Sequence, residues 1–362
     1  MPKLRFCMVG CGRIATLNKL GYLNHPDAEL YAVCDPIVSK AERLSAETGA
    51  KKIYSDFRDV LDDPDIDAVD ILVPHYLHRD MVIEACKAKK HVSVQKPMAL
   101  NVAECDDMIA AARENGVKLK VFENFIFYPP VVKAAELIRD GEIGEVCTIR
   151  LKMVAGGSQH GWHVDPATWL WRLEEKTCGG GPLVFDDGYH KFSLARHFLG
   201  QPEKVFAFIG STPIKGAVYK KPDGTEIQFY EDAPAMITWK TKDQRYGVFD
   251  ITYSPDLEIN TDYYPCDEQV EITGTRGVIR IARCTGKMLQ EPVLTLYRDG
   301  KISSWHTMRD DWSCSFIDST KDFIDALLKD RDPVLSGEEG REVLRFAIAA
   351  MESGKTGQPV DV

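Results

Sequence analysis

The feature that most constrains this chain is a short apolar strand that runs directly into a glycine-rich turn and then a helix. Leu4 to Val9 is the apolar run, and Gly10-Cys11-Gly12-Arg13-Ile14-Ala15 follows in the pattern G-x-G-x-x-A. The first glycine permits a tight turn, the second lets a pyrophosphate approach the backbone, and the small last residue lets the helix pack on the strand. Amide groups at the start of the helix attract phosphate. The segment therefore predicts a dinucleotide site that includes Gly10, Gly12, Arg13 and Ile14.

A second predicted strand supports this interpretation because it ends in an acid. Glu29 to Cys34 is the strand, and Asp35 follows it at about the distance expected for a ribose-binding carboxylate. Asp35 would accept hydrogen bonds from the adenosine ribose and would repel a 2′-phosphate, and the local sequence contains no arginine to bind that phosphate. We therefore expect NAD rather than NADP. In the alternative interpretation, Asp35 only caps the next helix.

Strands and helices continue to alternate over the first third of the chain. Strands are expected at residues 68–74, 91–94 and 117–122, and helices at 79–89 and from a capping box at Asn101 and Glu104 to Gly116. This alternation predicts a doubly wound parallel sheet, in which ligands bind beyond the carboxyl ends of the strands. We assign residues 1–125 to an NAD-binding Rossmann domain. The side chains expected at its ligand edge are Pro74, His75, Lys96, Glu123 and Asn124.

The pattern changes in residues 126–362, which we assign to a second domain for substrate binding and oligomerisation. Strands that follow one another without intervening helices indicate an antiparallel or mixed sheet. This α+β domain is predicted to contain a large, open, mostly antiparallel sheet, within a chain of the α/β class. An open sheet face needs a cover, so we expect a homodimer or homotetramer. Strands are expected at 146–154, 204–209, 235–240, 246–253, 269–272, 277–282 and 293–297, and helices at 315–329 and 338–352.

A long connection, residues 155–181, joins the first two strands of this second domain. Loops of that length are usually functional or disordered, and the tryptophans in this one argue against disorder. Because aromatic faces stack on the apolar faces of sugar rings, the loop is a candidate substrate contact through His163, Trp169, Trp171 and Arg172. The alternative is that the tryptophans anchor the loop to the core or to an oligomer interface.

The glycine run that ends this loop leads to an acid and an imidazole four residues apart. The segment reads Gly179-Gly180-Gly181-Pro182-Leu183-Val184-Phe185-Asp186-Asp187-Gly188-Tyr189-His190. If a helix begins near Asp187, this spacing places Asp186 and His190 on one side of its first turn. A carboxylate against an imidazole fixes the tautomer and stabilises the imidazolium that forms on protonation. The alternative is a helix-capping acid followed by a buried histidine.

Composition argues against several classes of protein. A chain of 362 residues exceeds one typical core, and 44% apolar with 28% charged residues is typical of soluble globular proteins. We expect no membrane segment and no signal peptide, because no apolar run is long enough and the N-terminus enters a strand at once. A net charge of −10, spread along the chain, argues against nucleic-acid or membrane partners. The ten cysteines include no C-x-x-C pair, which predicts reduced thiols, no metal site and a cytoplasmic location.

Several motifs, taken in order, resemble the Gfo/Idh/MocA oxidoreductases, the family of glucose–fructose oxidoreductase and inositol dehydrogenase. After the glycine turn, Val73-Pro74-His75-Tyr76-Leu77-His78 is similar to the family's T-P-N-x-x-H segment, and Gln95-Lys96-Pro97 is similar to its E-K-P motif. Gly141-Glu142-Ile143-Gly144 is similar to the family's link into the second domain. The segment from Gly179 to Gly200 is similar to its G-G-G…D-x-G-x-H…G block. The resemblance covers nearly the whole chain.

The resemblance implies a Lys–Asp–His site in an NAD(P)-dependent oxidoreductase that acts on CH–OH groups. Lys96 would stabilise the developing alkoxide, and His190, oriented by Asp186, would remove the hydroxyl proton while the hydride passes to the nicotinamide. Cofactor contacts would come from Gly10, Gly12, Arg13, Ile14, Asp35, Pro74, His75, His78, Gln95, Lys96 and Asn124. Substrate contacts would come from Lys96, Asn124, His163, Trp169, Trp171, Arg172, Asp186 and His190.

Some positions depart from the family pattern. Gln95 stands where Glu is usual, so a hydrogen bond near the nicotinamide ribose would persist without the charge. His75 stands where Asn is common, Ser193 where Asp is usual, and Phe127 where many members carry Arg. These departures concern the identity of the substrate rather than the core chemistry.

From these features we expect an NAD-dependent dehydrogenase that oxidises a secondary hydroxyl of a sugar, glycoside or cyclitol to a ketone. One alternative is a redox-neutral enzyme with tightly bound NAD, which oxidises a sugar transiently before elimination or epimerisation. A second alternative is a dinucleotide-binding sensor without turnover. Accumulation of reduced cofactor favours the dehydrogenase, and turnover without net reduction favours the redox-neutral enzyme. NAD binding without oxidation of any sugar favours the sensor.

Overall fold

The computed structural model of this chain describes residues 3–162, 166–172, 174–282 and 284–362 and divides into two compact units. Unit 1 consists of residues 1–124 and 315–344, and unit 2 of residues 125–314 and 345–362. The division into 1–125 and 126–362 stays a prediction about domains. The compact units differ from it in residues 315–344, because helix α9 (Ser313–Leu328) places Phe323 and Ile324 in the apolar core of unit 1.

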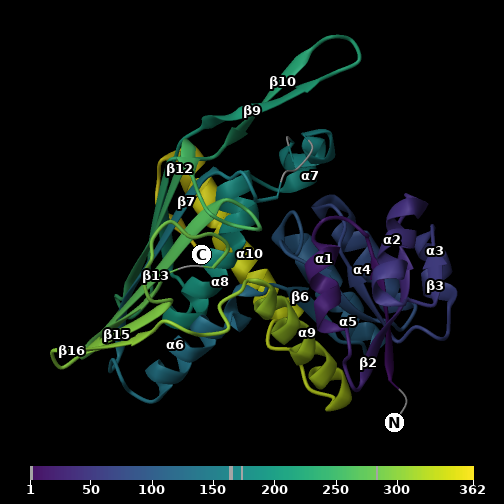
Figure 1. Cartoon of the computed structure of the whole chain (residues 1–362), viewed down its shortest axis with the longest axis horizontal. Helices are drawn as coiled ribbons and strands as arrows, with labels where there is room; N and C mark the ends of the chain where they lie inside the picture. The colour runs from purple at the N-terminus through teal and green to yellow at the C-terminus, as the bar shows by residue number, and fades with distance from the viewer. Residues whose placement is uncertain (1–2, 163–165, 173, 283) are drawn as a thin grey trace. The chain divides into compact units, whose positions relative to one another are not determined.

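Unit 1 is built on a six-stranded parallel sheet in the order β3-β2-β1-β4-β5-β6, which confirms the predicted doubly wound fold (Figure 1). The central strands are almost wholly buried, as expected for a parallel sheet covered by helices. The strands are β1 (Leu4–Val9), β2 (Ala28–Cys34), β3 (Lys52–Tyr54), β4 (Ala68–Ile71), β5 (His91–Gln95) and β6 (Leu119–Phe122). The helices between them are α1 (Ala15–Asn18), α2 (Val38–Thr48), α3 (Phe57–Asp62), α4 (His78–Lys87) and α5 (Val102–Asn115).

Helix α5 illustrates how local sequence fixes an element of unit 1. The Asn101 side chain accepts a hydrogen bond from the Glu104 amide at 3.0 Å, and the Glu104 carboxylate accepts one from the Leu100 amide at 3.0 Å. This pair of bonds is closely related to the predicted capping box. At the other end, Gly116 takes the left-handed conformation with φ of 67°. The short edge strand β3 was not predicted, because its three residues carry no buried apolar pattern.

Unit 2 is built on a nine-stranded sheet in the order β16-β15-β14-β13-β7-β12-β11-β8-β17. Strands β7 and β12 pair in parallel and the other neighbours are antiparallel, which confirms the predicted mostly antiparallel sheet. Strand β7 extends three residues beyond its predicted end. The strands are β7 (Val146–Gly157), β8 (Lys204–Ile209), β11 (Ala235–Lys240), β12 (Tyr246–Glu258), β13 (Cys266–Gly274), β14 (Gly277–Ile281), β15 (Leu294–Arg298), β16 (Lys301–Trp305) and β17 (Val360–Asp361).

Helices lie on one face of this sheet. In Figure 1, α8 (Gly188–Leu199) and the later part of α10 (Gly337–Thr356) run along that face, and no helix drawn from the described residues covers the other. Phe208 of β8 and Met236 of β11 are register partners that point away from the helices and are 59% and 47% exposed. Unit 2 also contains α6 (Pro129–Arg139) and α7 (Glu175–Cys178).

A hairpin that the sequence did not reveal extends beyond the strand ends of the large sheet. Its strands are β9 (Thr212–Lys220) and β10 (Glu226–Glu231), and Figure 1 shows its tip far from the sheet. Few of its residues are buried, so it carries no alternating apolar pattern. The hairpin matters because β10 ends at Glu231, next to Asp232.

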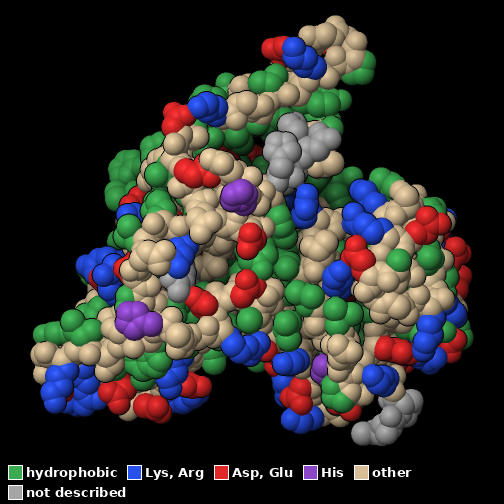
Figure 2. Space-filling view, viewed as in Figure 1, with side chains coloured by type: hydrophobic (Ala, Val, Ile, Leu, Met, Phe, Trp, Pro, Cys, Tyr) green, Lys and Arg blue, Asp and Glu red, His purple; other side chains and the backbone are tan. Residues whose placement is uncertain are grey.

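The described residues contain no candidate membrane-spanning helix, no disulfide bond and no cluster of metal ligands. None of the helices in the described part of the chain has the length and apolarity to cross a bilayer. All ten cysteines are described, and each is a free thiol. Within the described ranges, no group of three or more His, Cys, Asp or Glu is arranged to hold a metal ion. Figure 2 shows acidic and basic side chains interspersed on the face that it draws.

Candidate active site

The glycine turn after β1 has the geometry that a dinucleotide needs. Gly10 has φ of +96°, and a Cβ atom there would lie 2.3 Å from the Leu72 carbonyl oxygen, so only glycine fits. A Cβ atom at Gly12 would have no atom within 4 Å, which leaves open space beside the backbone. Arg13 and Ile14 follow, immediately before α1. The turn therefore presents accessible backbone where a pyrophosphate is expected.

Asp35 connects this turn to the end of β2. Its Oδ2 accepts a hydrogen bond from the Cys11 amide at 2.8 Å, and its Oδ1 accepts one from the Ile37 amide at 2.8 Å. A carboxylate oxygen has two acceptor sites, so each oxygen retains one for a ribose hydroxyl. Arg43 of α2, which the sequence interpretation did not anticipate, donates to the Cys11 carbonyl oxygen at 3.1 Å.

Gln95 supplies an independent test of whether a dinucleotide fits. Its Oε1 accepts a hydrogen bond from the Lys96 amide at 2.9 Å, while its Nε2 is buried and has no partner among the residues described. A buried donor without an acceptor is costly, so a ligand that offers an acceptor here would stabilise the site. Together with Gly12 and Asp35, Gln95 fits the NAD that the glycine turn predicts.

The remaining predicted residues of unit 1 lie where β4, β5 and β6 end. His78 is buried with Nδ1 at 3.0 Å from the Pro97 oxygen and Nε2 at 3.0 Å from the Val73 oxygen, so it connects the loops that carry Pro74 and Lys96. The buried His75 ring lies beside it, with centroids 5.7 Å apart. Lys96 precedes a cis peptide bond to Pro97. Asn124 donates to Ser315 Oγ at 2.6 Å.

In unit 2, Asp186 and His190 lie on consecutive turns of one continuous helical segment. The π-helix η5 (Pro182–Asp187) runs directly into α8, and the Asp186 amide donates to the Gly181 oxygen five residues earlier at 3.1 Å. Both residues are buried, at 7% and 4% exposed. The predicted helix near Asp187 is therefore present. Its π-helical start was not predicted, and such segments often occur at functional sites.

Asp232, which follows the β9–β10 hairpin, caps the start of this helical segment. Its Oδ1 accepts a hydrogen bond from the Leu183 amide at 2.7 Å and its Oδ2 one from the Val184 amide at 3.0 Å. A negative charge at a helix N-terminus is stabilising. A Cβ atom on Gly181 would lie 2.0 Å from Asp232 Oδ2, so the glycine leaves room for the carboxylate. Sequence reasoning missed Asp232 because it is so far along the chain.

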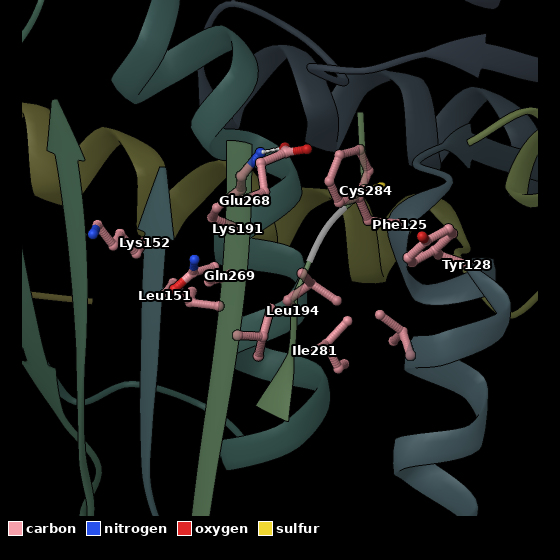
Figure 3. A pocket seen from close by; sticks show the side chains of 12 residues that line it. Phe125, Tyr128, Leu151, Lys152, Lys191, Leu194, Glu268, Gln269, Ile281 and Cys284 are labelled. Carbon is pink, nitrogen blue, oxygen red and sulfur yellow. Dashed lines mark hydrogen bonds and ion pairs between the residues drawn. The ribbon is translucent and has the colours of Figure 1, made fainter. Parts of the chain in front are cut away.

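The residue after the imidazole is a buried cation. Lys191 forms ion pairs with Asp187 at 3.0 Å and with Glu268, shown as a dashed line at one end of a small cavity in Figure 3. Burial lowers the pKa of Lys191, but the two carboxylates outweigh it and the net pKa is raised. Phe125 stacks on the His190 ring with centroids 4.1 Å apart, and Lys191 Nζ lies 4.6 Å from the Phe125 centroid. Helix α8 is thus held by charge and by ring contacts.

The long loop reaches the same helix through Arg172. Arg172 Nε donates to Asp186 Oδ2 at 2.9 Å, and the guanidinium lies 4.0 Å from the Trp171 ring centroid and 5.1 Å from that of Trp169. Trp162, in contrast, packs into an aromatic cluster. The structure therefore brings Arg172, Trp169, Trp171 and Asp186 together, while His163 lies outside the described residues. The partners of Trp162 in that cluster are Tyr263, Tyr264 and Trp312.

A parallel sheet with a dinucleotide turn, joined to a mixed-sheet unit that carries an acid and an imidazole, defines an NAD-dependent oxidoreductase. Comparison with known families agrees. Residues 4–123 match the "Oxidoreductase family, NAD-binding Rossmann fold", and residues 131–280 match the "GFO/IDH/MocA C-terminal domain". The chain belongs to the Gfo/Idh/MocA family.

Individual relatives are similar over most of their length. Myo-inositol 2-dehydrogenase of Thermotoga maritima is 27% identical over 97% of this chain and 96% of its own. The 2,7-anhydro-N-acetylneuraminate hydratase of Mediterraneibacter gnavus is 28% identical over 78% of this chain and 68% of its own. A solved structure of levoglucosan dehydrogenase with NADH superposes with a TM-score of 0.82 at 22% identity, covering 99% of each chain. That likeness shows the fold.

Proposed function

We propose that this oxidoreductase oxidises a secondary hydroxyl of a sugar, glycoside or cyclitol to a ketone, with Lys96, Asp186 and His190 as its catalytic residues. The names of two relatives, an inositol dehydrogenase and a levoglucosan dehydrogenase, support this substrate class. NAD, when bound, supplies the hydride acceptor. The cofactor is held by the glycine turn, Asp35, Gln95 and the strand-end residues of unit 1.

Each of the three residues has a distinct role in the proposal. Lys96 donates a hydrogen bond to the reacting hydroxyl, and its charge stabilises the oxygen as negative charge grows on it. His190 takes the hydroxyl proton as a general base. Asp186 orients the imidazole and stabilises its protonated form, as a carboxylate does in other acid–base pairs.

The observation that carries this proposal is how firmly Asp186 and His190 are held. Asp186 accepts a hydrogen bond from Arg172, and the His190 ring is stacked on Phe125. Both lie on a helix whose first amides bond Asp232. A base that is fixed in this way can be aligned with a bound hydroxyl without further reorganisation.

The test is a screen for NAD reduction over polyols, sugars and glycosides, repeated with Lys96→Met and His190→Ala. Removal of a general base costs about 10²- to 10⁴-fold, so kcat should fall by at least that factor in His190→Ala. Lys96→Met should show a fall of similar size. NADH binding, measured by fluorescence titration, should persist in both.

Matched variants control for loss of packing or charge. His197→Ala removes an exposed imidazole two turns further along α8, and Lys87→Met removes a lysine at the end of α4. Both should keep near-normal turnover. Near-normal turnover in Lys96→Met or His190→Ala would instead remove that residue from the mechanism.

A second candidate function is a redox-neutral conversion in which the NAD is reduced and reoxidised within each cycle. The hydratase among the relatives favours this candidate, because its name describes a reaction without net oxidation. Substrate loss followed by chromatography, without growth of the absorbance of the reduced cofactor, would distinguish it. Accumulation of NADH in step with the substrate consumed would exclude it.

A further inference from the structure

Arg172 has more hydrogen-bonding capacity than its contacts use. A guanidinium carries five N–H donors in a planar fork. Only Nε is engaged, with Asp186 at 2.9 Å, and neither terminal nitrogen makes a hydrogen bond or ion pair within the described part of the chain. The side chain is 22% exposed, so a ligand can reach it.

The contacts that Arg172 does make hold the fork still without covering its donors. The guanidinium carbon lies 4.0 Å from the Trp171 ring centroid, which is the distance of a cation over an aromatic face. The N–H groups of a guanidinium point outward in its own plane, so a ring against its face leaves them available. The Nε bond to Asp186 then fixes the direction in which the remaining donors point.

The nearby carboxylates already have partners and do not consume this capacity. Asp187 and Glu268 share Lys191, and Asp232 accepts two backbone amides. Glu231 is buried, and burial followed by the neighbouring carboxylates raises its pKa to about 8, so it is largely protonated at neutral pH. Within the described residues, the two terminal nitrogens of Arg172 therefore have no acceptor besides the carboxylate that Nε already engages.

We propose that the Arg172 fork binds a carboxylate of the substrate, so that the substrate is a polyhydroxy acid such as a uronate or an aldonate. The inference rests on the proposed function, because it names the substrate class of the same site. Asp186 links the two, because the carboxylate that would orient His190 in the proposed function also bonds Arg172. The acid group of the substrate would thus be anchored within one side chain of the catalytic pair.

The first experiment compares matched substrates. NAD reduction is measured with each uronate and its parent aldose, and with each aldonate and its parent alditol, in the glucose and galactose series. The wild-type protein should prefer the acid, and Arg172→Lys, which keeps the charge but loses the fork, should lower this preference about 10- to 100-fold. Any disturbance of Asp186 affects both members of a pair and cancels in the ratio. Lys176→Gln, an exposed cation of the same loop, should leave the ratio unchanged.

The second experiment measures binding without turnover. Calorimetry with the NADH-loaded protein compares galacturonate and glucuronate with their uncharged methyl esters. The acids should bind at least about tenfold more tightly than the esters. In Arg172→Gln, the ratio of the two dissociation constants should fall to about one. Equal binding of acid and ester, or no binding of either, overturns the inference.

The two arms separate this inference from the proposed function. Efficient oxidation of the parent sugars with no preference for acids leaves the dehydrogenase intact and refutes the carboxylate site. A preference of binding for acids over esters, with no NAD reduction by any compound, supports the carboxylate site and refutes the dehydrogenase.

Discussion

Unit 1 and unit 2 hold their functional side chains by different means. In unit 1, Gln95 bonds the amide of the next residue, and Asp35 bonds an amide two residues on and the Cys11 amide of the glycine turn, 24 residues earlier. In unit 2, the helix that carries Asp186 depends on Asp232, 48 and 49 residues from the amides that it caps, and on Glu268, 77 residues from Lys191. The first arrangement follows strand ends and turns. The second depends on charges that only the tertiary fold brings together.

The largest expected effect is the loss of the buried cation of unit 2. Lys191→Met leaves Glu268 buried without its partner, and breaking a buried ion pair in this way costs about 3–5 kcal/mol. All six tryptophans lie in unit 2, so the midpoint of urea unfolding followed by tryptophan fluorescence measures the effect there.

A double variant tests the physical reason for that loss. Lys191→Met with Glu268→Gln removes the uncompensated charge while keeping an oxygen for the Thr285 amide. It should recover part of the lost stability. A double variant no more stable than Lys191→Met would mean that packing of the lysine stem, rather than charge, holds α8.

The next effect is expected at the helix cap. Asp232→Ala leaves two backbone amides without an acceptor, at a cost of about 2–3 kcal/mol in the free energy of unfolding. It should also lower kcat, because the proposed catalytic residues Asp186 and His190 lie on the helical segment that Asp232 caps. The dissociation constant of NADH should stay unchanged. Asp232→Asn keeps one side-chain oxygen as an acceptor, so its stability and kcat should lie between those of the wild type and Asp232→Ala. Asp223→Ala, in the exposed turn of the same hairpin, is the control.

Glu231 gives a smaller effect that depends on pH. Burial raises its pKa to about 8 from the ordinary 4.5, with Asp232, Asp187 and Asp186 adding to the shift, so the folded chain retains a proton that the unfolded chain has lost. The stability it contributes is therefore present below pH 4.5 and is lost as pH rises through 8. Glu231→Gln cannot ionise, so its melting temperature should match the wild type near pH 4.5 and exceed it by a few degrees above pH 8. Glu226→Gln, on the same strand but exposed, should show no such divergence.

The smallest effect is expected from a local contact of unit 1. Asn101→Ala removes the cap of α5, which costs about 1 kcal/mol. The transition reported by tryptophan fluorescence should not change, because unit 1 contains no tryptophan. Circular dichroism should detect the loss. If kcat fell as well, the contrast between local and long-range support would be wrong for this helix.

The parts of the molecule that sequence predicted are those that depend on near neighbours. The glycine turn, the strands of unit 1 and the start of α5 follow from periodicity, caps and glycine chemistry within a few residues. The mostly antiparallel sheet of unit 2 followed from the absence of helices between its strands. These patterns recur wherever such elements form, whatever surrounds them.

The parts that sequence could not predict depend on partners far along the chain. The residues around Gly181 do not predict that Asp232 lies against it, and those near His190 do not predict that Glu268 pairs with Lys191. Hairpin β9–β10 is largely exposed, so it leaves no apolar alternation to detect. Arg172 was included as a loop residue, but its bond to Asp186 spans 14 residues of irregular chain. The roles of the catalytic and binding residues themselves stay predictions.

Gly181, the last residue of the glycine run, is needed because it leaves space for the carboxylate of Asp232. A Cβ atom at position 181 would lie 2.0 Å from Asp232 Oδ2, so the carboxylate occupies the space that a larger side chain would need. Adding a single carbon by Gly181→Ala would displace that anion and leave the helix without its negative cap, even though the backbone at 181 is extended and could accept alanine. Gly181 therefore serves to accommodate a charged side chain rather than to provide backbone flexibility.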